Sequence, residues 1–190
     1  MASLVEKIVA VDDALRAADV PHAFGGALAL AFHIEEPRAT RDIDVNVFAP
    51  ADMAPVVFDA LPGDVKWSRA DVRSVEKIGQ VRLFWEDNPV DLFFSTHAFH
   101  DNAEAQIIEV PFADTTIPVL GATELAVFKA FFNRTKDWAD IEAMVDADAV
   151  ELHRALGWLV DLLGPDDERV NRFRALIERT PPAHEPRFAP

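Results

Sequence analysis

The sequence of 190 residues contains no cysteine. This absence excludes disulfide bonds and zinc sites with thiolate ligands, and it leaves the redox compartment undetermined. No apolar run reaches the roughly 20 residues that are needed to span a bilayer. The N-terminus also lacks the basic segment and following apolar stretch of a secretory signal. Together these absences predict a cytoplasmic protein that has no membrane partner.

Basic residues are scarce, with 18 lysines and arginines against 33 acidic residues and a formal net charge of -15. Proteins that hold nucleic acid over a wide surface usually present a basic face, because neutralising phosphates supplies much of the affinity. If RNA is bound, its contact must be short, or basic residues must cluster at the site. Scattered surface charge is an equally good interpretation. The candidates for such a cluster are Arg38, Arg41, Lys66, Arg69, Arg73, Lys77, Arg82, Lys129, Arg134 and Lys136.

Two adjacent glycines, Gly25 and Gly26, separate a short apolar segment at residues 22–24 from an apolar stretch at 27–33. This order predicts a strand, a turn and a helix. Glycine lets the backbone approach a phosphate closely, and the free N–H groups at a helix start favour an anion. A plain strand-to-helix turn is the better interpretation of the two glycines taken alone.

Two carboxylates separated by one residue, Asp42 and Asp44, follow in a β-branched run. Successive side chains of a strand point to opposite faces, so these two project together while Ile43 and Val45 pack on the other face. Adjacent anions repel each other unless a cation lies between them. A hard divalent cation with oxygen ligands meets this need, so the spacing predicts a magnesium site.

A third carboxylate, Asp91, lies among large apolar residues in the second strand of a predicted hairpin at residues 80–94. A carboxylate in such surroundings needs a partner. An arginine or a backbone donor is one alternative. We favour catalysis, because the pair Asp42 and Asp44 needs a third ligand.

The periodicity of the remaining chain predicts mainly helices. Lys129 is conspicuous in an apolar helix that begins at residue 121, where it either extends its ammonium to water or neutralises a bound phosphate. No helix is predicted between residues 65 and 79. The other predicted elements are helices at 3–18, 52–61, 149–163 and 166–179, with strands at 106–112 and 115–119. The expected divisions are a core at 1–120, a helical section at 121–180 and a loose tail at 181–190.

The order of these motifs resembles the nucleotidyltransferase superfamily that includes the DNA polymerase β-like enzymes. The resemblance rests on Gly25 and Gly26, then Asp42 and Asp44, then the single acid Asp91 in a later strand. A lone D-x-D is weak evidence, whereas several elements in the expected order are much stronger.

A second set of residues is similar to the AbiEii-type toxin branch of this superfamily. Lys129 is followed by Arg134, Lys136, Asp137 and Asp140, which match the K…R-x-K-D-x-x-D helix of that branch. The resemblance covers roughly the first three quarters of the chain, and the remainder carries no matching motif.

The resemblance implies an α+β fold with a mixed-sheet core flanked by helices and a helical C-terminal section. It also implies transfer of a nucleoside monophosphate from an NTP to an acceptor hydroxyl, with two Mg²⁺ ions, or Mn²⁺ in their place. The implied metal and catalytic ligands are Asp42, Asp44 and Asp91. The implied nucleotide-binding residues are Gly25, Gly26, Lys129, Arg38, Arg134 and Lys136.

The AbiEii-type resemblance implies a tRNA 3′ end as acceptor and an antitoxin protein as partner. One alternative is a small-molecule nucleotidyltransferase, which the acidic composition favours because cationic aminoglycosides prefer an anionic cleft. Another alternative is a catalytically silent member of the fold that binds a partner.

Overall fold

The computed structural model describes residues 2–35 and 39–180, which belong to two compact units. The first unit runs to Gly121 apart from residues 33–35, and the second contains those three residues and the chain from Ala122 onward. The predicted tail at 181–190 lies outside the described residues.

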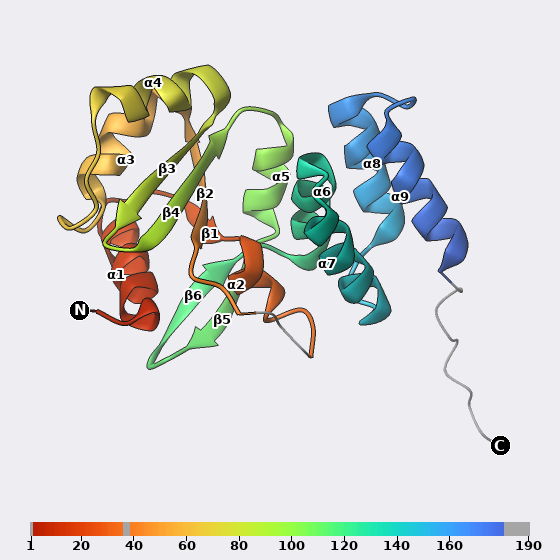
Figure 1. The fold of residues 1–190 in the computed structure, drawn as a ribbon, viewed down its shortest axis with the longest axis horizontal. Coiled ribbons are helices and arrows are strands. Elements are labelled where there is room, and N and C mark those ends of the chain that lie inside the picture. The colour runs from red at the N-terminus through yellow and green to blue at the C-terminus, as the bar shows by residue number, and fades with distance from the viewer. Residues whose placement is uncertain (1, 36–38, 181–190) are drawn as a thin grey trace. The chain divides into compact units, whose positions relative to one another are not determined.

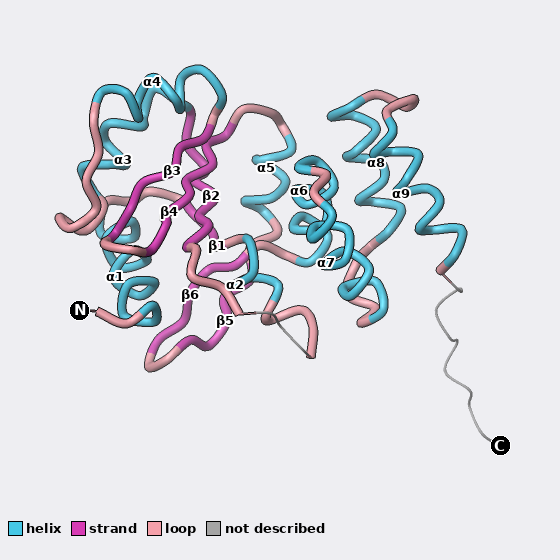
Figure 2. The backbone as a smooth tube through the Cα atoms, viewed as in Figure 1, coloured by secondary structure: helices cyan, strands magenta, loops and turns pink. Residues whose placement is uncertain are grey.

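The first unit is built on a six-stranded mixed sheet with the strand order β3-β4-β2-β1-β6-β5 (Figure 2). Strand β2 is parallel to β4 and β1 is parallel to β6, while the other neighbouring strands are antiparallel. This sheet confirms the predicted α+β class. The strands are β1 (His22–Phe24), β2 (Ile43–Pro50), β3 (Gln80–Trp85), β4 (Asn88–Ser95), β5 (Ile108–Phe112) and β6 (Thr115–Val119).

Helices of the first unit pack on the apolar face of β3 and β4, and α1, α3 and α4 lie on one side of these strands (Figure 1). Phe58 of α3 contacts Phe94 of β4 edge to face, with ring centroids 6.1 Å apart. Because Phe94 and Asp91 are three residues apart in one strand, Asp91 points to the opposite face. The helices are α1 (Leu4–Ala17), α2 (Gly26–Leu30), α3 (Ala54–Ala60), α4 (Arg69–Ile78) and α5 (Phe99–Ala105), with a 3₁₀ turn at Ala51–Met53 before α3.

The prediction that residues 65–79 contain no helix is wrong, because α4 lies there. Ser68 and Asp71 form a capping box at its start, and Gly79 ends it with a left-handed φ of 69°. Val72, Val75 and Ile78 recur at three-residue steps in α4, a spacing that fits a helix, so the helical period was present in the sequence. The helix after the glycine pair is also shorter than predicted and ends at Leu30.

The second unit is helical, as predicted for the C-terminal section. Its helices are α6 (Ala122–Phe132), α7 (Thr135–Asp146), α8 (Leu152–Leu163) and α9 (Glu168–Arg179). Trp138 of α7 and Phe173 of α9 are fully buried with ring centroids 6.4 Å apart. Within the described part of the chain, every helix is too short or too polar to traverse a lipid bilayer.

Candidate active site

Two of the predicted acids, Asp44 and Asp91, are paired across neighbouring strands, and Asp42 directly precedes the first of these strands. Asp91 of β4 is the register partner of both Asp44 on β2 and Arg82 on β3. Directly paired residues of adjacent strands point to the same face, so these side chains are neighbours. The backbone N–H of Gly25 donates to the Asp44 carbonyl oxygen at 2.9 Å, which brings the glycine pair to these acids. We call Asp42, Asp44 and Asp91 the carboxylate row.

Asp91 is held by two hydrogen bonds from Arg82. The arginine Nε donates to Oδ1 at 2.7 Å and Nη2 donates to Oδ2 at 2.6 Å. The side chain of Asp91 is 13% exposed, whereas that of Arg82 is 54% exposed. The hydrogen bonds that Arg82 donates to Asp91, and then the negative charges of the whole carboxylate row, raise the pKa of Arg82. The arginine partner that the sequence left open is therefore present, and all three acids act on its charge.

Gly26 lies directly against the carboxylate of Asp44. Its φ is +57°, and a Cβ at this position would lie 1.8 Å from Asp44 Oδ2. At Gly25 a Cβ would lie 2.8 Å from the side-chain nitrogen of the buried Asn46. A side chain at either glycine would thus push the backbone away from the row, which explains why both positions are glycine.

Lys7, Asn88 and Thr40 fix the backbone at the start of β2. The buried Lys7 donates through Nζ to Asn88 Oδ1 at 2.8 Å. Asn88 Nδ2 in turn donates to the Arg41 carbonyl oxygen at 2.9 Å. The backbone N–H of Asp42 donates to Thr40 Oγ1 at 3.1 Å. This chain of contacts connects α1 through the β3–β4 turn to the first acid of the row.

Neither Lys7 nor Asn88 was predicted as part of the site, and Arg82 was named only as one basic residue among many. The signal for Lys7 was present, because it lies on the apolar face of α1 beside Leu4 and Ile8. A charged residue in such a stripe needs buried partners, but the sequence does not show which turn supplies them.

The carboxylate row suits a divalent cation in its chemistry. Asp42 and Asp44 are half-buried, and Asp91 lies on the adjoining strand. Their oxygens are the ligands that Mg²⁺ and Mn²⁺ prefer. Within residues 2–35 and 39–180, however, no three ligating side chains are gathered closely enough to hold a metal ion. The three acids therefore fit a metal only if Asp91 is released from Arg82.

Two of the three predicted nucleotide-binding residues of the second unit, Lys129 and Arg134, have acidic partners. Lys129 Nζ lies 2.7 Å from Asp140 Oδ2, and both side chains are buried. Arg134 donates to both carboxylate oxygens of the buried Asp137, at 2.6 and 3.0 Å. Lys136 is exposed at the start of α7. Arg38, the remaining predicted ligand, lies outside the described residues.

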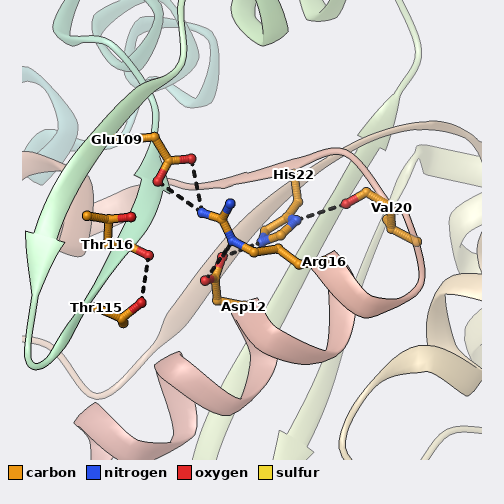
Figure 3. Close-up of polar contacts among 7 residues, drawn as sticks. All are labelled: Asp12, Arg16, Val20, His22, Glu109, Thr115 and Thr116. Atoms are coloured by element: carbon orange, nitrogen blue, oxygen red, sulfur yellow. Dashed lines mark hydrogen bonds and ion pairs between the residues drawn. The ribbon is translucent and has the colours of Figure 1, made fainter.

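A second polar cluster joins α1 to β1 and β5 (Figure 3). Arg16 donates through Nη2 to both oxygens of Glu109 at 3.0 and 2.9 Å, and through Nε to Asp12 at 2.9 Å. His22 contacts the Val20 carbonyl oxygen at 2.9 Å and Asp12 at 3.0 Å. Each charged group here has a partner within the first unit, which fits a structural role.

No family model and no curated protein sequence matches this chain. Solved structures do match it. ANT(2")-Ia in complex with adenylyl-2"-tobramycin is 12% identical with a TM-score of 0.58, over 91% of this chain and 98% of that one. A lincosamide antibiotic adenylyltransferase bound to lincomycin is 15% identical with a TM-score of 0.52, over 74% of this chain and 96% of that one.

A third similar structure is an antigenic nucleotidyltransferase-like protein from Paracoccidioides brasiliensis, which is 15% identical with a TM-score of 0.50. It is matched over 87% of this chain and 91% of that one. The chain has the nucleotidyltransferase fold. At these identities the similarity concerns the fold alone, and it does not confirm the AbiEii-type branch.

Proposed function

We propose that this protein transfers a nucleoside monophosphate from an NTP to an acceptor hydroxyl. One observation carries the proposal. Asp44 and Asp91 are paired on parallel strands, with Asp42 two residues upstream and the backbone of Gly26 against Asp44. Acids that meet across neighbouring strands can hold a divalent cation and, through it, the phosphates of a nucleotide.

In this proposal Asp42, Asp44 and Asp91 hold two Mg²⁺ ions, which Mn²⁺ can replace. When bound, the metals neutralise the triphosphate and lower the pKa of the acceptor hydroxyl. The acceptor oxygen forms a bond to the α-phosphorus, the bond to the pyrophosphate oxygen breaks, and the hydroxyl proton is released. The protein supplies positioning and fixed charge rather than a covalent intermediate.

The same proposal gives the triphosphate its protein contacts. Gly25 and Gly26 allow a phosphate to approach the backbone beside the carboxylate row. The remaining predicted ligands of the triphosphate are Arg38, Lys129, Arg134 and Lys136. For Lys129 this role requires that the ammonium leaves Asp140, its present partner at 2.7 Å.

For the acceptor we propose a tRNA 3′ end, with an antitoxin protein as the controlling partner. The support is the similarity of Lys129, Arg134, Lys136, Asp137 and Asp140 to the AbiEii-type helix. A second candidate is a cationic small molecule with a free hydroxyl, and the net charge of -15 favours it. Two of the similar structures are antibiotic adenylyltransferases, which makes aminoglycosides and lincosamides the first compounds to try.

Label transfer tests both candidates. The purified protein is incubated with each α-³²P-labelled NTP and Mg²⁺, either with total tRNA or with a panel of aminoglycosides and lincosamides. We expect one acceptor class to become labelled, and Asp44→Asn to reduce the rate by about a thousandfold or more, because metal ligation supplies several kcal/mol. Asp52→Asn, an exposed acid of the same unit, is the control and should keep the full rate.

The two acceptor classes give different results. Labelled tRNA supports the first candidate, and a labelled antibiotic without labelled tRNA supports the second. Full activity of Asp44→Asn would contradict the proposed site. A folded protein that labels no acceptor with any NTP would favour the catalytically silent alternative.

A further inference from the structure

Arg82 lies where a cation is expected at the carboxylate row. It is opposite Asp91 in the antiparallel β3–β4 pair and on the same face as Asp44. Its guanidinium satisfies both oxygens of Asp91 at 2.7 and 2.6 Å. Such bidentate, charge-assisted contacts are among the strongest hydrogen bonds between side chains. The arginine therefore occupies one lone pair on each oxygen of Asp91, and its positive charge repels a second cation at the same carboxylate.

The pair is also built so that it can open. The Arg82 side chain is 54% exposed, and β3 is an edge strand of the sheet. A released guanidinium can therefore reach water by rotating its own side chain, without movement of the strand. Asp91 is 13% exposed and would lose its counter-charge at that moment. A cation must then replace the arginine, because an isolated buried carboxylate is costly.

We propose that Arg82 is an internal counter-ion that competes with a divalent cation for Asp91. The inference rests on the proposed function, since it assumes that the carboxylate row binds metal. While no metal is bound, the positive charge of Arg82 reduces the repulsion between the acids of the row. A metal ion can bind Asp91 only by displacing the arginine. Arg82 thus positions Asp91 and sets the metal affinity, without contacting the reacting atoms.

Direct metal titration tests this competition without any turnover. Mn²⁺ is titrated calorimetrically into the nucleotide-free full chain and into Arg82→Gln and Arg82→Lys. We expect Arg82→Gln to bind Mn²⁺ about 10- to 100-fold more tightly, which is the range for the loss of hydrogen bonds to a charged group. Arg82→Lys should lie between the two, because an ammonium cannot reproduce the bidentate fork.

Arg16→Gln is the matched control. This arginine also binds two carboxylates of the first unit, Asp12 and Glu109, but none of the carboxylate row. Its removal should leave the Mn²⁺ affinity unchanged. If Arg82→Gln does not fold, circular dichroism will show it, and Arg82→Lys then carries the test. An unchanged or weaker Mn²⁺ affinity in a folded Arg82 variant overturns the inference.

The failure of this inference can be told from the failure of the proposed function. The double variant Arg82→Gln/Asp44→Asn should lose the gain in Mn²⁺ affinity, and a gain that persists would show binding elsewhere and overturn the inference. Label transfer that needs Asp44, together with an unchanged Mn²⁺ affinity in Arg82→Gln, rejects the role of Arg82 alone. Absence of both Mn²⁺ binding and label transfer rejects both.

Discussion

Two ion pairs, one in each unit, involve residues that the sequence marks as functional, and they differ in exposure. In the sheet unit Arg82 holds Asp91 with a side chain that is 54% exposed. In the helical unit Lys129 holds Asp140, and these side chains are only 5% and 8% exposed. The first pair can exchange its cation with solvent by a side-chain rotation, whereas opening the second separates two charges that are both buried.

This difference separates two uses of a charged pair. Removing one partner of a buried pair is strongly destabilising because the remaining charge stays buried. In the Arg82–Asp91 pair only the arginine is exposed, so another cation can replace the guanidinium, whereas Asp91 still needs a counter-charge. We therefore expect stability to depend on the Lys129–Asp140 pair and metal affinity to depend on the Arg82–Asp91 pair.

The largest expected effect is at the buried pair. Lys129→Met leaves the Asp140 carboxylate without its ammonium, and we expect the free energy of unfolding to fall by about 3–5 kcal/mol. The double variant Lys129→Met/Asp140→Leu removes both charges and should recover most of this loss. Urea unfolding followed by circular dichroism measures all three proteins. A loss below about 1 kcal/mol, together with a raised KM for NTP, would instead favour the predicted nucleotide-binding role of Lys129.

The second-largest effect is expected in the sheet unit, at Gly26. In Gly26→Ala the added Cβ meets Asp44 Oδ2 at 1.8 Å, and the backbone keeps an unfavourable φ of +57°. Backbone strain of this kind costs about 1–3 kcal/mol. We expect a comparable loss of unfolding free energy and a larger loss of label transfer, because Asp44 must move.

Gly63→Ala is the matched control for this change. A Cβ at Gly63 meets nothing within 4 Å, so stability and label transfer should both stay close to those of the parent protein. Unchanged label transfer in Gly26→Ala would show that the exact place of the Asp44 carboxylate does not matter for activity, and it would contradict the proposed site.

The sequence predicts those parts of the fold whose signal is local. Ser3 and Glu6 form the predicted capping box at the start of α1, and the hairpin that carries Asp91 lies at β3 and β4. Alternation along β2, which begins at Ile43, is also local, and it places the side chain of Asp44 on the face opposite to those of Ile43 and Val45. Whether the acids of the carboxylate row bind metal remains a prediction.

Partners far apart in the chain could not be predicted in this way. Nothing in the spacing shows that Asp91 pairs with Arg82 rather than with another of the ten basic candidates, because the choice depends on the register of β3 against β4. Lys129 and Asp140 likewise meet only because α6 packs on α7. Helix α4 is different, because its signals are local. Ser68 and Asp71 form its capping box and Gly79 ends it, so the sequence contained enough information to predict this helix.

A smaller effect is expected for helix α4, which is followed directly by β3, the strand that carries Arg82. Ser68 Oγ accepts from the Ala70 N–H at 3.2 Å, so Ser68→Ala should cost about 1 kcal/mol, as is usual for the loss of an N-cap. Ser3→Ala, at the capping box of α1, is the comparison and should cost a similar amount. If Ser68→Ala proves neutral in urea unfolding, the cap of α4 does not contribute to the stability of the sheet unit.

The smallest expected effect is a difference in acid sensitivity between the units. In the sheet unit, burial lowers the pKa of His100 from 6.5, and its neighbours His97 and Asp101 modify this shift. The unfolded chain then binds the proton first, so stability is present above pH 6.5 and falls as the pH drops toward the lowered pKa. In the helical unit, hydrogen bonds from Arg169 lower the pKa of Asp167 from 3.8 to about 2, so its contribution is lost only as the pH falls from 3.8 through that value.

Urea unfolding at pH 8 and pH 5.5 measures the histidine contribution. We expect the parent protein to lose stability between these values with a slope of at most one proton from this group, and His100→Gln to show a shallower slope. Asp167→Asn should leave the slope in this range unchanged, because both its folded and unfolded pKa values lie below pH 5.5. Hydrogen exchange at pH 5.5 should show opening of the sheet unit before the helical unit. Equal slopes in the parent and His100→Gln would remove His100 as a source of this difference.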